Sequence, residues 1–272
     1  FESGASTSSA ILPYCFSYFY LVFNCKSMHL CFKNKYQKCR KSVFEFLNGF
    51  KMLSNETYMK KIHNFYLPDW DNHFQDRFNL NIGYQEAQRN RALSFVEDFG
   101  VAVDCGAHVG LWSRDLSNFF ENLYCFEPVE EFFECLKLNV NSKNAKLYNL
   151  GLGEKKINTE AVVTKSSGNS GGSRTLTNNY EIKKEDEIKK IKLVDLDSFN
   201  LVKIDFIKID VEGLGLQVLN GMINTLKNCN PVVCIELFEK VEKTDQINFM
   251  NKLGYELVDI ITKEYVFKKN KA

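Results

Sequence analysis

Val101-Ala-Val-Asp104-Cys-Gly106-Ala-His108-Val-Gly110 is an apolar run followed by an acid, a histidine and two glycines. The apolar run predicts a buried strand, and the glycines before a helical pattern predict a tight turn that leads into a helix. Because Gly106 and Gly110 lack a Cβ atom, a ligand can approach the backbone closely there. We therefore expect a small molecule to lie across this turn. A glycine-containing turn without a ligand is the alternative.

The acid at the end of the predicted strand indicates which kind of molecule the turn binds. A dinucleotide fingerprint needs G-x-G-x-x-G, so that bare backbone and a helix dipole face a pyrophosphate. In this chain Asp104 stands in place of the first glycine and Val109 in place of the third. A fixed negative charge repels phosphate and attracts a cation. The sequence thus favours S-adenosylmethionine, which carries a sulfonium and an ammonium but no phosphate.

Strands and helices alternate after this turn. Residues 123–126 and 145–150 have the apolar composition of buried strands, and the apolar residues between 129 and 140 recur at helical spacing. Residues 205–210 and 232–236 have the pattern of later strands. This order predicts an α/β fold in which helices cover both faces of a doubly wound, mostly parallel sheet.

The composition and periodicity of the chain predict two domains. Residues 1–82 would form an N-terminal extension, mainly helical from residue 26 onward, that acts as a helical cap. Residues 83–272 would form the α/β domain, with an insertion at about residues 153–194. The insertion resembles a hairpin with a mobile loop rich in Gly, Ser and Asn, and such loops often cover a site. The last strands, residues 256–261 and 265–268, are predicted to pair as a hairpin.

The composition is typical of a soluble globular protein. Hydrophobic residues make up 44%, charged residues 25%, and the formal net charge is +1. A basic excess between Lys26 and Lys61 is interpreted as a solvated surface, because no nucleic-acid-binding motif accompanies it. Nine cysteines without C-x-x-C spacing indicate a reducing compartment. We therefore expect a cytoplasmic protein that binds no nucleic acid.

Residues 10–25 form an aromatic and apolar run with the features of a membrane segment. The run has sixteen residues and contains Pro13, whereas a membrane-spanning helix needs about 20 residues. A signal peptide would also need a basic stretch before the run, and none precedes it in this sequence. We expect a packed or poorly ordered extension, with membrane association as the alternative.

Acidic residues recur where the predicted strands end. Asp104, Glu127, Asp210 and Glu236 each end or follow a strand, and Gly151 follows another. Ligands bind at the carboxyl ends of parallel strands, so these acids should face one crevice. Carboxylates that share a crevice repel one another unless a cation or hydrogen-bond donors join them. Their clustering is therefore the best indication of a functional site.

Several polar residues of this region also have a structural alternative. Glu127 can bind a ribose, as an acid about 20 residues after the turn does in dinucleotide sites, or cap the next helix. His108 can contact a cofactor or point to solvent. Asp210 and Glu212 can bind substrate, act as a base, hold a metal or cap the helix that follows them.

Several motifs occur in order and at suitable spacing. They are Asp104-Cys-Gly-Ala-His-Val-Gly110, Phe126-Glu127-Pro128, Leu196-Asp-Ser-Phe199, Ile207-Lys-Ile-Asp210-Val-Glu212-Gly213 and residues 231–236, with Gly83-Tyr84-Gln85 before them. Together they resemble the FkbM-type methyltransferases over roughly residues 83–267. The resemblance implies a class I methyltransferase fold with a Rossmann-like sheet, S-adenosylmethionine as the donor and usually an oxygen acceptor.

The resemblance also implies which residues hold the cofactor. Asp104 would face its methionine part and Glu127 its ribose. The expected cofactor contacts are Tyr84, Asp104, Gly106, His108, Gly110, Glu127, Pro128 and Gly151. Two positions depart from the family pattern: Gln85 stands where an acid is common, and Gly215 stands where a glutamate often follows the glycine of the Asp-Val-Glu-Gly run.

The expected activity is methyl transfer to a hydroxyl group of a sugar, glycan, lipid or secondary metabolite. A hydroxyl must lose its proton, so a base should lie within hydrogen-bond reach. The candidate bases are Asp210, Glu236 and, third, His108, while Glu212 should contact the substrate. A divalent metal held by Asp210 is a less favoured route. The alternatives are a nicotinamide-dependent oxidoreductase and a non-catalytic binding module derived from a methyltransferase.

Overall fold

The computed structural model describes residues 59–79, 84–176, 181–237 and 240–269. The chain divides into two compact units, Phe1–Glu56 and Thr57–Ala272, and every described residue belongs to the second. The helical cap expected before residue 59 and the apolar run at residues 10–25 therefore lie outside the described residues. Among the described helices, none is long and apolar enough to cross a membrane.

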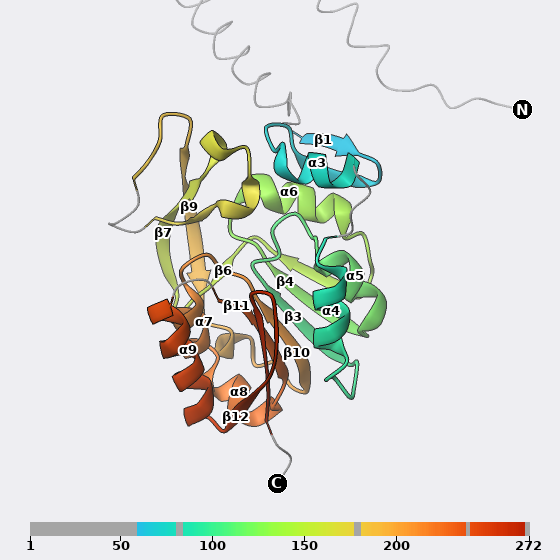
Figure 1. Cartoon of the computed structure of the whole chain (residues 1–272), viewed down its shortest axis with the longest axis vertical. Coiled ribbons are helices and arrows are strands. Elements are labelled where there is room, and N and C mark those ends of the chain that lie inside the picture. Colours follow the sequence, from blue (N-terminus) through green and yellow to red (C-terminus); the bar gives the residue numbers. More distant parts are fainter. Residues whose placement is uncertain (1–58, 80–83, 177–180, 238–239, 270–272) are drawn as a thin grey trace, which may run out of the picture. The chain divides into compact units, whose positions relative to one another are not determined.

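A seven-stranded sheet forms the centre of the second unit (Figure 1). Its strands, in the order β12-β13-β11-β10-β3-β4-β5, are β3 (Val101–Cys105), β4 (Asn122–Phe126), β5 (Ala145–Tyr148), β10 (Ile204–Ile209), β11 (Val232–Glu236), β12 (Tyr255–Ile261) and β13 (Glu264–Lys269). β13 is antiparallel to both of its neighbours, β11 and β12, and all other neighbouring strands of this sheet are parallel. The doubly wound, mostly parallel sheet and the C-terminal hairpin are thus confirmed.

Two groups of helices cover the two faces of this sheet. Successive side chains of a strand point to opposite faces, so Ala102 packs in one core cluster and Val103 in the other. The first face is covered by α4 (Glu86–Leu93), α5 (Ser113–Phe119) and α6 (Glu130–Asn139), and the second by α7 (Gly215–Asn220), α8 (Ile223–Cys229) and α9 (Lys240–Lys252). Figure 1 shows α4 and α5 to the right of the sheet and α7 and α9 to the left.

The strand order reverses between β3 and β10. The chain runs outward from β3 through β4 to β5, returns to β10 beside β3, and continues outward through β11. In open α/β sheets, ligands bind at the carboxyl ends of the strands at such a reversal. Asp104 near the end of β3 lies in register with Lys208 of β10, and Asp210 follows directly after β10. The fold therefore brings two of the predicted site residues to this point.

The segment between β5 and β10 forms a second sheet, of order β6-β9-β7-β8. Its elements are β6 (Gly151–Leu152), β7 (Ile157–Val163), β8 (Arg174–Thr175) and β9 (Glu187–Val194), with the short 3-10 helices η1 (Lys165–Ser167), η2 (Ser170–Gly172) and η3 (Asp197–Phe199). β7 and β9 pair as the expected hairpin. The expected mobile loop is held at Ser170, whose N–H and hydroxyl both donate to the Asp71 carboxylate.

A hairpin of β1 (Met59–Ile62) and β2 (Phe65–Pro68) precedes α3 (His73–Asn79). The sequence predicts mostly helix here, and for residues 59–68 that prediction is wrong. The hairpin packs on α6, where Asn139 forms hydrogen bonds with both backbone groups of Tyr66. These contacts come from a helix distant in sequence, so local periodicity does not report them.

Candidate functional site

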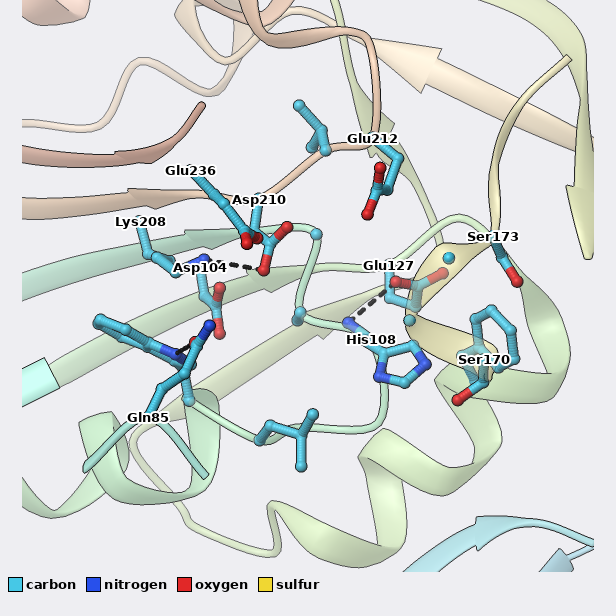
Figure 2. A pocket seen from close by; sticks show the side chains of 18 of the residues that line it. Gln85, Asp104, His108, Glu127, Ser170, Ser173, Lys208, Asp210, Glu212 and Glu236 are labelled. Carbon is cyan, nitrogen blue, oxygen red and sulfur yellow. Dashed lines mark hydrogen bonds and ion pairs between the residues drawn. The ribbon is translucent and has the colours of Figure 1, made fainter. Parts of the chain in front are cut away.

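A cavity of about 940 Å³ opens at the carboxyl ends of β3, β4, β10 and β11 (Figure 2). Ligand pockets usually enclose roughly 300–1,000 Å³, so this one lies near the upper end of that range. The predicted site residues that line it are Tyr84, Asp104, Gly106, His108, Glu127, Pro128, Gly151, Asp210, Glu212 and Glu236. The structure thus brings nearly the whole predicted set together.

The two glycines of the central turn differ in their surroundings. Their φ angles are 82° at Gly106 and 93° at Gly110, values that favour glycine. A Cβ atom at Gly106 would lie 1.9 Å from the carbonyl oxygen of Asp210. One at Gly110 would lie 2.9 Å from Val140 and 3.0 Å from Leu136. Gly110 does not line the cavity, so the structure gives it a packing role and offers no support for the predicted cofactor contact.

Glu127 lies at the beginning of α6 and lines the cavity, while its contact with a ribose stays a prediction. Its Oε2 atom accepts the His108 N–H at 2.9 Å and its Oε1 atom accepts the Val129 N–H at 2.8 Å. The second bond places the carboxyl at the beginning of α6, while the side chain also lines the cavity. Burial raises the pKa of Glu127 to about 8, although both backbone bonds lower it. At neutral pH the carboxyl therefore mostly keeps its proton, so it can donate to a ligand hydroxyl as well as accept from one.

Asp104 is buried at the carboxyl end of β3. Its Oδ2 atom accepts a hydrogen bond of 2.5 Å from the Ser113 hydroxyl at the beginning of α5. Burial raises the pKa of Asp104 to about 6, while the Lys208 ammonium lowers it. At neutral pH the side chain is therefore mostly ionised. The negative charge that the sequence predicts is present, but a lysine partly offsets it.

A buried ionic group lies at the ends of β10 and β11. The Lys208 Nζ atom is 3.0 Å from Asp210 Oδ2, and Glu236 forms a side-chain hydrogen bond with Asp210. Burial would raise the pKa of Asp210, but Lys208 and this hydrogen bond hold it below its ordinary value. Burial and the neighbouring Asp210 raise the pKa of Glu236 to about 9. At neutral pH Asp210 is thus ionised, and Glu236 keeps a proton with which to donate.

Lys208 is a buried charged residue of the cavity that the sequence analysis missed. It is 1% exposed and lines the cavity. The available signal was a lysine between two isoleucines in Ile207-Lys208-Ile209, an apolar run predicted to be a buried strand. Lysine is almost never fully buried unless it is paired, so a buried-strand prediction implies an acidic partner.

Aromatic rings form the wall of the cavity around His108. The imidazole lies 4.7 Å from the Phe132 ring and 5.6 Å from the Phe74 ring, and Phe74 in turn contacts Tyr84 at 5.2 Å, measured between centroids. Burial lowers the pKa of His108 to about 4 and raises that of Tyr84. Figure 2 shows the imidazole on the Ser170 side of the cavity and Asp210 with Glu236 on the other side. A neutral imidazole in this position can contact a bound ligand more readily than it can exchange a proton with Asp210 or Glu236.

The rim of the cavity is polar and includes the insertion. Ser170, Ser173 and Arg174 line it, and Arg174 Nη2 lies 3.5 Å from Glu212 Oε2. The predicted substrate contact Glu212 is therefore in an ion pair with the insertion. The Gly- and Ser-rich composition of the loop predicted that it covers a site, but not which of its residues contact the cavity.

Gln85 departs from the family pattern and has two partners that explain it. Its Nε2 atom donates to Glu264 Oε1 at 2.8 Å, and its Oε1 atom accepts the Trp112 indole N–H at 2.6 Å. Glu264 is 1% exposed. An acid at position 85 would face this buried carboxylate without a donor, so the glutamine matches Glu264.

We expect Gln85→Glu to destabilise the fold by about 1–3 kcal/mol, because it replaces a buried hydrogen bond with two facing carboxylates. Urea unfolding at pH 7.5 measures this change. In the double variant Gln85→Glu, Glu264→Gln, the new amide at position 264 can donate to the new carboxylate at position 85. This variant should regain at least half of the lost free energy of unfolding. A double variant less stable than Gln85→Glu alone would contradict this pairing.

Gly215, the second departure, is matched by Gln246 of α9. A Cβ atom at Gly215 would lie 2.2 Å from Gln246 Oε1. Gln246 is buried, and within the described part of the chain its Oε1 atom has no hydrogen-bond partner. The amide thus fills the space that a side chain at position 215 would need, beside Glu212 and Glu236.

Among the residues that the structure describes, no group of three or more His, Cys, Asp or Glu side chains is arranged to hold a metal ion.

The doubly wound sheet, the glycine turn and the acids around one cavity are typical of the class of α/β proteins whose ligand site lies at the switch point. The sequence matches the methyltransferase FkbM domain over residues 104–265, which is more than half of the chain. The chain belongs to the FkbM methyltransferase family.

Several solved methyltransferase structures are similar to this one. The FkbM methyltransferase from Methylobacillus flagellatus shares 18% identity at a TM-score of 0.42, with 62% of this chain and 42% of that chain covered. Precorrin-6y C5,15-methyltransferase from Geobacter metallireducens shares 14% at 0.41, with 67% and 87% covered. Magnesium protoporphyrin IX methyltransferase from Synechocystis shares 9% at 0.44, with 82% and 91% covered. The alignment thus spans less than half of the FkbM structure, and no curated protein sequence matches this chain.

Proposed function

We propose that this protein is an S-adenosylmethionine-dependent methyltransferase that methylates a hydroxyl group of a sugar, glycan, lipid or secondary metabolite in the cytoplasm. The observation that carries the proposal is the acid pair of Asp210 and Glu236 in the cavity. One member is ionised and the other protonated at neutral pH. Such a pair can accept one proton from a hydroxyl without holding two negative charges in a buried site.

The β3–β4 side of the cavity suits S-adenosylmethionine. Asp104 offers a carboxylate to the positive methionine part, and Glu127 offers a carboxyl group that can exchange hydrogen bonds with ribose hydroxyls. The buried Nε2 atom of His108 has no hydrogen-bond partner among the described residues, and a bound ligand can supply one. When bound, this cofactor supplies a methyl group already activated by the sulfonium.

The remaining work of the protein is to position the acceptor and to remove a proton. Holding the acceptor oxygen in line with the methyl group can lower the barrier by several kcal/mol. As the oxygen–carbon bond forms, the hydroxyl proton becomes strongly acidic, so Asp210 can accept it although its pKa is low. Glu236 donates its hydrogen bond to Asp210 and keeps that carboxylate oriented. The polar rim at Arg174, Ser173 and Glu212 supports a polar acceptor.

A transfer assay with methyl-labelled S-adenosylmethionine tests the proposal. We expect label on free hydroxyl acceptors from a glycan, lipid and metabolite panel, and none on matched acceptors whose hydroxyl is already methylated. Calorimetry with S-adenosylhomocysteine and with NADH accompanies it. Binding of S-adenosylhomocysteine without transfer to any acceptor would favour a non-catalytic module. Tight binding of NADH alone would favour an oxidoreductase.

A further inference from the structure

Lys208 occupies a position that places its charge among the acids of the cavity. It lies in register with Asp104 on the neighbouring strand β3, so both side chains point to the same face of the sheet. Its Nζ atom is 3.0 Å from Asp210 Oδ2 and 5.0 Å from the centroid of the Trp112 ring. Figure 2 shows the ammonium directed at Asp210, with Asp104 beside it.

The groups that act electrostatically on this ammonium are almost all acidic. Asp210, Cys234, Glu236 and Asp104 raise the pKa of Lys208 above its ordinary value, against the lowering effect of burial. The lysine side chain is 2% exposed. An unpaired buried ammonium is strongly unfavourable, and so are two unpaired buried carboxylates. Lysine and acids therefore stabilise one another, and a residue of the same chain balances part of the negative charge of the acids.

We propose that Lys208 is the resident counter-cation of the site, a positioning residue that holds the Asp104 and Asp210 carboxylates together and sets how strongly the site prefers a positively charged donor. With Glu236 protonated, Asp104 and Asp210 contribute two negative charges and Lys208 one positive charge. One net negative charge then faces the ligand. The ammonium is paired with Asp210 and lies near the Trp112 ring, so a cation of the chain itself already compensates part of the acidic charge.

This role predicts a particular change in ligand preference. S-adenosylmethionine and S-adenosylhomocysteine differ by a methyl group and by the positive charge on sulfur. Removing the Lys208 charge leaves the acids uncompensated, so the cationic donor gains affinity relative to the neutral product. We expect Lys208→Met to raise the ratio of the two dissociation constants, product over donor, at least tenfold at pH 8. Lys208→Arg keeps the charge and should leave this ratio within threefold of that of the unaltered protein.

Isothermal titration calorimetry with the two ligands measures the ratio, and neither measurement needs an acceptor. A ratio that does not change in Lys208→Met would overturn the proposal, because a merely structural lysine alters both affinities alike. If the ratio of dissociation constants changes equally in Lys208→Met and Lys208→Arg, the proposal is overturned as well.

A double-mutant cycle with Asp210→Asn covers the case in which Lys208→Met folds poorly. If the two side chains balance each other, Lys208→Met, Asp210→Asn should be at least as stable in urea as Lys208→Met alone. Additive losses would contradict the ion pair. The inference rests on the proposed transfer chemistry at Asp210, yet the two failures are distinguishable. If no methyl transfer is found but the ratio of dissociation constants changes in Lys208→Met, only the proposed function is contradicted. If transfer is found but the ratio does not change, only the role of Lys208 is contradicted.

Discussion

Asp210→Asn is expected to lower kcat for hydroxyl methylation by about 100-fold to 10,000-fold, the usual contribution of a positioned base. Asparagine keeps the size of the side chain but cannot accept the proton that the hydroxyl loses. S-adenosylhomocysteine affinity should change far less, because the expected ribose and methionine contacts, Glu127 and Asp104, are unaltered. Steady-state kinetics and calorimetry on the same preparation separate the two effects. A kcat within fivefold of the unaltered enzyme would show that Asp210 is not the base.

Glu236→Gln is the matched control for this prediction. Glu236 holds its proton at neutral pH, and a glutamine amide can donate to Asp210 in the same way, so kcat should fall less than tenfold. The pH profile distinguishes the two carboxyl groups further. If Asp210 is the base, the rate is level at neutral pH and falls above pH 9, where Glu236 loses its proton, and Glu236→Gln removes this fall. A rate that instead rises through pH 9 would identify Glu236 as the base.

Gly106→Ala is expected to destabilise the fold by about 2–5 kcal/mol. The positive φ angle of 82° costs an alanine about 1–2 kcal/mol. The new methyl group would also lie 1.9 Å from the Asp210 carbonyl oxygen, and such overpacking costs about 1–3 kcal/mol more. Because the displaced atom belongs to the backbone of Asp210, activity should be lost along with stability. Urea unfolding followed by circular dichroism gives the change in the free energy of unfolding.

Gly213→Ala isolates the steric part of this effect. Its φ angle is 81°, and nothing lies within 4 Å of the position that a Cβ atom would take. This variant should therefore show only the backbone cost of about 1–2 kcal/mol. If both alanine variants lose the same stability, the close approach of the central turn to β10 is not important for the fold.

Much of the site could be predicted from local sequence because short-range patterns specify strand ends. An apolar run that stops at an acid places that acid at the edge of the sheet, and parallel strands bring their carboxyl ends together. For this reason Asp104, Glu127, Asp210 and Glu236 line one cavity as predicted. The C-terminal hairpin follows from the same logic of strand and turn.

Side-chain pairing across the fold was beyond such patterns. The hydrogen bond between Gln85 and Glu264 joins residues 179 positions apart. A single sequence does not show which residues so far apart in the chain come into contact. Gly110 has the same local sequence pattern as Gly106, yet it packs against α6, and only Gly106 of the two lines the cavity. The hairpin before α3 also depends on a partner far along the chain.

The succession of strands and helices along the chain and the acids at the strand ends thus follow from the amino-acid sequence, since each depends on residues close together in the chain. The family follows from several such short motifs that occur in order. The charge balance of the site does not. It depends on the register of β3 and β10, which places the Lys208 ammonium beside Asp104 and 3.0 Å from Asp210. Electrostatic energy depends on distances in space, so the partner of each acid is fixed only when the chain has folded.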